Sequence, residues 1–145
     1  MANEVNVQAT LTYSKYSPVV QAAAGVTFDQ RSTGKAAICN IMLIDSAAAG
    51  TQLTFGDAAA TSPAGQGVGY LFLKNLDPSA IDPNNQPKFV EVAIGGTAFN
   101  TGATIFCKIL PQQFFLIPLY QGNTTKLWAK STAGTGEVLV MAVEQ

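Results

Sequence analysis

Apolar and polar residues alternate with a period of two along much of the chain. In residues 5–13, VNVQATLTY, every odd-numbered position is apolar or aromatic and every even-numbered position is polar. This is the pattern of a half-buried β-strand. Residues 17–30 carry Pro18 at their start and Gly25 inside, which favours an edge or bulged strand over a central one.

Further short segments are rich in β-branched or aromatic residues and are bounded by Gly, Pro, Asn or Asp. They are 38–44, 68–75, 88–94, 103–110, 113–119, 126–131 and 137–144. Short strands at this spacing, without a 3.6-residue period, predict an all-β protein, an antiparallel β-sandwich or jelly-roll-like fold. The Ala-rich patches are too short to nucleate a helix of more than about two turns. We expect one domain over residues 1–145.

Two connections need an explanation. Residues 46–67 are rich in Ala, Gly, Ser and Thr, and a structureless loop of this length is uncommon in a compact domain. We expect an arm that reaches a neighbour and hides a short strand at 51–55, TQLTF. The strands at 68–75 and 88–94 are expected to pair as a hairpin, with the loop 78–87 as its tip.

The composition suggests that part of the surface of this protein is covered by other protein subunits. The chain has 145 residues, enough for one core, but only 12% are charged, about half of what a soluble domain usually carries. Its mean hydropathy is +0.21. The longest apolar run, 36–44, is much shorter than the roughly 18 residues of a membrane span. We therefore expect contacts with other subunits and no membrane partner.

The candidate interface residues follow from this expectation. They lie in the amino-terminal segment, in the 46–67 arm and at the single Trp: Met1, Ala2, Asn3, Leu53, Phe55 and Trp128. The indole of Trp128 is expected in the core or at an interface, with its N–H bonded.

Residues suited to catalysis are scarce. The chain has no histidine, which removes Ser-His-Asp and Cys-His pairs, His-containing zinc sites and the commonest general base. The acidic residues show no meaningful paired spacing, and the oxygen-rich loop from Asp77 to Asn85 lacks the EF-hand pattern. We expect no enzyme activity, no metal and no cofactor.

The net charge and the two cysteines bear on nucleic-acid binding and on disulfide formation. The net charge is −1 and Arg31 is the only Arg, so a basic nucleic-acid surface is not expected. Cys39 and Cys107 lie in apolar runs and are expected as buried reduced thiols, although their spacing does not exclude a disulfide. The start MANEVNVQ has no secretory pattern, so we expect the chain to fold in a cytosol.

The order of motifs in the second half resembles small virion proteins of tailed bacteriophages. These motifs are GYLFLKNLD, then FVEV, then ILPQQFFLIPL, KLWAKS and EVLVMAVE, over residues 68–145. Pro111 and Pro118 bracket a strand whose pairing they limit to a sheet edge or to a short stretch. The resemblance implies a β-sandwich that sits on the virion as a decoration or cement protein.

That resemblance implies partners and a location. The partners would be the major capsid protein and further copies of this chain, as a homotrimer by preference or as a dimer, on the capsid surface. One alternative is a structural protein of the tail or of the head-to-tail connection. Another is a carbohydrate-binding adhesion module, in which Tyr70, Tyr120 or Trp128 would stack on a sugar.

Overall fold

The fold is all-β over the part of the chain that the structure describes. The structure is a computed structural model, and it describes residues 4–13, 20–29, 37–54, 68–78, 88–118 and 126–144. These residues form strands and turns and contain no helix. The chain divides into two compact units, Met1–Lys35 with Gln145, and Ala36–Glu144. The two four-stranded sheets lie in the second unit, and the first unit holds a two-stranded sheet of its own.

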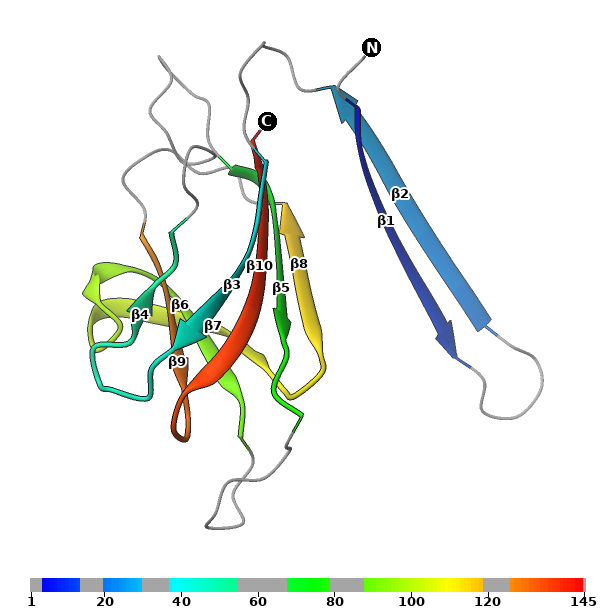
Figure 1. The fold of residues 1–145 in the computed structure, drawn as a ribbon. Coiled ribbons are helices and arrows are strands. Elements are labelled where there is room, and N and C mark those ends of the chain that lie inside the picture. Colours follow the sequence, from blue (N-terminus) through cyan, green and yellow to red (C-terminus); the bar gives the residue numbers. More distant parts are fainter. Residues whose placement is uncertain are drawn as a thin grey trace. The chain divides into compact units, whose positions relative to one another are not determined.

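The second unit is an antiparallel β-sandwich of two four-stranded sheets (Figure 1). Sheet I has the strand order β3-β10-β5-β8, and sheet II has the order β4-β9-β6-β7. In chain order the strands are β3 Ala37–Ile44, β4 Thr51–Gln52, β5 Val68–Asn75, β6 Val90–Ala98, β7 Thr101–Ile109, β8 Phe114–Pro118, β9 Leu127–Ser131 and β10 Gly136–Glu144. Most of the strands predicted from alternation are confirmed, with ends shifted by a few residues.

The first strand of the sandwich pairs with its last strand, the second with the second to last, and so on inward. Counted inward from both ends of the sandwich, β3 pairs with β10, β4 with β9, β5 with β8 and β6 with β7. The eight strands are thus one long antiparallel ribbon with the β6–β7 hairpin at its tip. The ribbon rolls up, so that β10 also pairs with β5 and β9 with β6.

The core lies between the sheets because every second residue of each strand points inward. Leu71 and Leu73 of β5 and Val138 and Val140 of β10 are at most 1% exposed, and so is Val92 from sheet II. The rest of this cluster is Ile44, Leu53, Val90, Ile109, Leu127, Ala129 and Ala142. Burial of these aliphatic side chains is the main driving force for the sandwich.

The predicted hairpin of 68–75 with 88–94 is wrong. β5 pairs with β10 and β8 in sheet I, whereas β6 pairs with β7 and β9 in sheet II. Both strands have an apolar face, and the two faces meet across the core instead of joining edge to edge. The connection leads from one sheet to the other; its residues 79–87 lie outside the described part.

The first unit contains two ten-residue strands, β1 Glu4–Tyr13 and β2 Val20–Asp29, which we call the N-terminal hairpin. Their register pairs Val7 with Val26 and Ala9 with Ala24, and pairs Glu4 with Asp29. Directly opposed residues share a face of an antiparallel pair. The bulge allowed for at Gly25 is absent, since the register runs without a shift.

A buried side chain ties three segments of the sandwich together. Asn75, at the end of β5, is 1% exposed; its Nδ2 donates to the carbonyl of Ile109 at 3.1 Å, and its Oδ1 accepts from the N–H of Asp77 at 3.0 Å. Gln112 adds bonds from its Nε2 to the carbonyls of Leu76 and Asp77 at 2.8 and 3.0 Å. Asn75 thus fixes the end of β5 against the turn that joins β7 to β8.

Replacing this side chain should destabilise the sandwich. Asn75→Ala removes both hydrogen bonds that this buried side chain makes, and we expect a loss of about 2–3 kcal/mol in the free energy of unfolding. The measurement is denaturant unfolding followed by circular dichroism. Asn100→Ala, at an exposed turn, is the control and should change stability by less than about 0.5 kcal/mol. Equal midpoints for the two variants would contradict the assigned role.

Candidate interface

The outward face of sheet I is apolar across all four of its strands. We call this surface the outer apolar face. It consists of Cys39, Ile41 and Leu43 of β3, Leu139 and Met141 of β10, Phe72 of β5, and Phe114 and Leu116 of β8. They face outward because they alternate with core residues along the same strands.

The register arranges these side chains in rows across the sheet. Cys39 is opposite Met141, which is opposite Phe72, and Ile41 is opposite Leu139 in the next row. The rings of Phe72 and Phe114 stack with centroids 5.6 Å apart. The rows therefore form one continuous surface.

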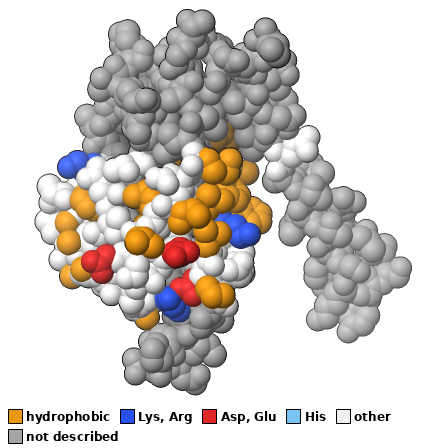
Figure 2. Space-filling view, in the orientation of Figure 1, with side chains coloured by type: hydrophobic (Ala, Val, Ile, Leu, Met, Phe, Trp, Pro, Cys, Tyr) orange, Lys and Arg blue, Asp and Glu red, His pale blue; other side chains and the backbone are white. Residues whose placement is uncertain are grey.

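Several of these side chains are well exposed in the protomer. Exposed fractions are 54% for Ile41, 63% for Leu43, 64% for Phe114 and 39% for Met141. Figure 2 shows hydrophobic side chains gathered over the side of the sandwich formed by β10, β5 and β8. A continuous apolar surface of this kind is unusual on a monomer and marks an interaction site.

The outward face of sheet II is covered by the chain itself. Trp128 of β9 points outward there, yet it is only 8% exposed, and its Nε1 donates to the carbonyl of Gly95 at 3.0 Å. It packs with Ala93 and Phe99 in a small second cluster. Gly95 and Gly96 have φ of 84° and 68°, values that favour glycine and let the β6–β7 hairpin turn back over the indole.

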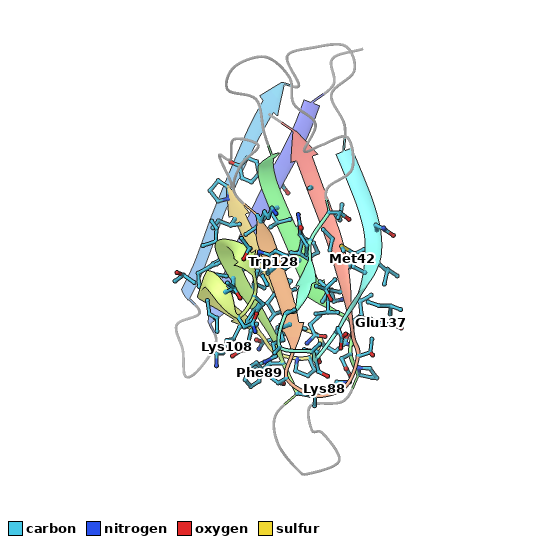
Figure 3. The ribbon with its side chains drawn as sticks, turned by 90° about the vertical axis from the view of Figure 1, so that its left-hand side faces the viewer. Met42, Lys88, Phe89, Lys108, Trp128 and Glu137 are labelled. Atoms are coloured by element: carbon cyan, nitrogen blue, oxygen red, sulfur yellow. The ribbon has the colours of Figure 1, made fainter. Side chains whose placement is uncertain are left out.

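Charged pairs lie on that outward face and at the adjoining end of the sandwich. Lys108 of β7 bonds to Glu91 of β6 at 2.9 Å and lies 4.7 Å from the ring centroid of Phe89. Lys88 pairs with Asp77. Figure 3 shows Lys88, Phe89 and Lys108 together at one end of the sandwich. The outward face of sheet II therefore carries a pair of opposite charges, whereas Lys74 and Glu137 are the charges on the outer apolar face of sheet I within the described residues.

A smaller apolar edge adjoins this face where β7 and β8 meet. Phe106 is the extra residue of a β-bulge, because Val92 and Ala93 of β6 oppose Cys107 and Ile105. Its ring contacts that of Phe115 with centroids 5.7 Å apart. Ile105 and Phe106 are 45% and 39% exposed, so apolar surface continues around the edge of the sandwich.

Two of the predicted interface residues are buried instead. Leu53 is 3% exposed within the main core, and Trp128 lies under the β6–β7 hairpin. The predicted strand at 51–55 exists as β4, which pairs with β9, so residues 46–54 belong to the sandwich and not to an arm. Met1, Ala2, Asn3, Phe55 and the rest of the arm lie outside the described residues.

The residues of the outer apolar face were not predicted from the sequence. Alternation alone does not show which apolar face of a strand is covered by another layer. The signal was the run at 38–44, ICNIMLI, which has apolar residues on both faces. Such a run is typical of a strand buried on both sides. β3 is a sheet edge with one covered face, so its second apolar face is exposed.

The two cysteines are unpaired. Cys39 was expected to be buried but is exposed on the outer apolar face, because it alternates with the inward residues of β3. Cys107 is half-buried beside the core, and burial raises the pKa of its thiol. The described residues contain no cluster of three or more His, Cys, Asp or Glu that could hold a metal ion.

The single Trp reports on the cover over sheet II. A Cβ at Gly96 would clash with the backbone of Thr101 and Gly102, whereas a Cβ at Gly134 would meet nothing. Both glycines have positive φ, so Gly134→Ala is a matched control for backbone strain. We expect Gly96→Ala to lift the hairpin from Trp128 and to increase acrylamide quenching of its fluorescence several-fold, while Gly134→Ala leaves quenching unchanged. Unchanged quenching in a folded Gly96→Ala protein would contradict the described cover.

Comparisons with family models, with curated proteins and with solved structures give no match to this chain. Within the described ranges, the structure has no helix of the length and apolar character needed to span a membrane. The function of this protein is therefore inferred from the outer apolar face.

Proposed function

We propose that the protein is a non-enzymatic structural protein of a tailed-phage virion, which decorates or cements the outer capsid shell. It would bind the major capsid protein and copies of itself at the capsid surface. The observation that carries the proposal is the outer apolar face, which stands exposed on a chain with only 12% charged residues. Such a surface is suited to permanent burial in an assembly.

The topology supports the same proposal. We infer that the rolled ribbon of eight strands is a jelly roll, an architecture of viral capsid and lectin domains. The two outward faces also differ in character. The charged face of sheet II suits contact with water, and the apolar face of sheet I suits contact with protein. A subunit with one face toward solvent and one face toward protein fits a layer on a shell.

The burial of Trp128 bears on the carbohydrate-binding alternative. A sugar-stacking aromatic has to present its ring to solvent. Trp128 is 8% exposed and its N–H is already bonded to Gly95, so it offers no such platform. Tyr70 is half-buried, and Tyr120 lies outside the described residues.

The test is the copy number of the protein in purified particles of the phage that encodes it. Quantitative mass spectrometry should find on the order of hundreds of copies per particle, as the repeated sites of a symmetric shell require. About a dozen copies or fewer would place it at the neck or tail instead. Complete absence from particles would refute a virion role.

A rebinding assay tests the surface. Particles stripped of the protein should recover heat resistance when the wild-type protein is added back. Ile41→Lys places a charge on the outer apolar face and should reduce this recovery strongly, because the charge would lose water on binding. Thr104→Lys, at an exposed position of sheet II, is the control and should restore resistance as the wild type does.

A further inference from the structure

Asp77 and Lys88 form a charged pair that is largely shielded from water, where the chain passes from one sheet to the other. Asp77 follows β5 of sheet I, and Lys88 precedes β6 of sheet II. The Lys88 amino group pairs with Oδ2 of Asp77, and the two side chains are 20% and 9% exposed. In the ion pair of Lys108 with Glu91, by contrast, the lysine side chain is 56% exposed. Burial removes hydration from both charges of the Asp77–Lys88 pair, which is costly.

Asp77 is held in place through its backbone. Its N–H donates to Oδ1 of Asn75 at 3.0 Å, and its carbonyl accepts from Nε2 of Gln112 at 3.0 Å. Asn75 is itself buried and bonded to the carbonyl of Ile109. Gln112 has φ of 63°, in the left-handed region that residues other than glycine rarely adopt. The Asp77 carboxyl group is therefore attached to a fixed segment of the chain.

Lys88 is held by a different part of the chain, the turn between β9 and β10. Its Nζ donates to the carbonyl of Thr135 at 3.4 Å. The N–H of the next residue, Phe89, donates to Oγ1 of Thr132 at 3.0 Å, and the carbonyl of Phe89 accepts from the N–H of Thr132 at 3.0 Å. The amine and the carboxyl group are thus held together from two sides. Well-oriented groups of this kind react with effective molarities of about 10⁵–10⁸ M.

We propose that Lys88 and Asp77 condense into an isopeptide bond that cross-links the two sheets. The ammonium group first passes one proton to the carboxylate, and the neutral amine nitrogen then attacks Cγ of Asp77. The Nζ–Cγ bond forms and one Cγ–O bond breaks. The released oxygen leaves as water, with one proton from the carboxylic acid and one from the amine. No atom is oxidised or reduced, and no co-reactant is needed.

The buried site favours the amide product. Condensation replaces two charges that have little contact with water by one neutral group, so the cost of burying charge is removed. The bond closes residues 77–88 into a covalent ring that joins the end of β5 to the start of β6. Such a cross-link lowers the conformational entropy of the unfolded chain and thereby stabilises the folded sandwich. This inference goes beyond the proposed function, because the bond forms within one chain and depends on no partner.

Mass spectrometry of the purified full chain tests the cross-link directly. The denatured protein should be lighter than its sequence by one water molecule. Trypsin cleaves after a free lysine but not after an acylated one, so Lys88 should resist cleavage. Residues 75–108, between the cleavage sites after Lys74 and Lys108, should be recovered as one peptide that lacks one water. Complete cleavage after Lys88, with both product peptides at their sequence masses, would overturn the proposal.

Two lysine-to-arginine variants separate this bond from any other loss of water. Lys88→Arg keeps a positive charge opposite Asp77 but removes the attacking amine, so this protein should have its full sequence mass. Lys108→Arg alters the exposed ion pair instead and should remain one water lighter. Water loss that persists in Lys88→Arg, or that disappears from a folded Lys108→Arg protein, would place the modification elsewhere and overturn the assignment.

Thermal unfolding tests the effect of the bond on stability. Lys88→Arg should melt on the order of 10 °C below Lys108→Arg, as expected for the loss of a cross-link in a domain of this size. Circular dichroism before heating verifies that both variants are folded. Equal midpoints would overturn the stabilising role of the bond. All of these measurements use purified protein without particles, so they are independent of the copy-number test of the proposed function.

Discussion

A two-layer sandwich covers only one face of each of its sheets, and the rest of this molecule depends on that constraint. Leu71 and Leu73 of β5 are buried because sheet II lies above them, while Phe72 between them points away from the core. A strand that is apolar at both sets of positions therefore needs two covering layers. Sheet I has such residues in all four of its strands, and within the described residues of the sandwich unit sheet II covers its inner side alone.

Sheet II meets the same constraint by a different route. Its outward Trp128 is covered by the β6–β7 hairpin, which bends back at Gly95 and Gly96 and accepts the indole N–H. Beside this cluster Glu91 pairs with Lys108, and Ile105 on the same face is 45% exposed. Within the described residues of the sandwich, no hairpin covers the outward side of sheet I, where Lys74 and Glu137 lie among apolar neighbours. The two sheets of equal strand number therefore differ in how their outward apolar residues are covered.

Alternation was sufficient to find the strands but not their partners. The hairpin expected between 68–75 and 88–94 is absent, since neighbouring strands with one apolar face each can pair edge to edge or pack face to face. Only tertiary contacts distinguish the two arrangements. For the same reason Leu53 was expected at an interface but is buried, and Cys39 was expected in the core but is exposed. Trp128 was expected either in the core or at an interface, and it is buried with its N–H bonded. The edge position of the strand before Pro118 was predicted correctly, because proline restricts pairing by itself.

The β-bulge at Phe106 shows how the sandwich limits unwanted association while the outer apolar face remains available. β7 is a nine-residue edge strand, and a long regular edge invites pairing with any other strand. The bulge interrupts its ladder, and Lys108 projects from it with 56% of its side chain exposed. Both devices oppose edge-to-edge growth. The opposite edge of sheet II is β4, which is only two residues long. Association through the edges of sheet II is thus disfavoured, whereas sheet I offers a partner its outer apolar face, where side-chain shape decides which partner fits.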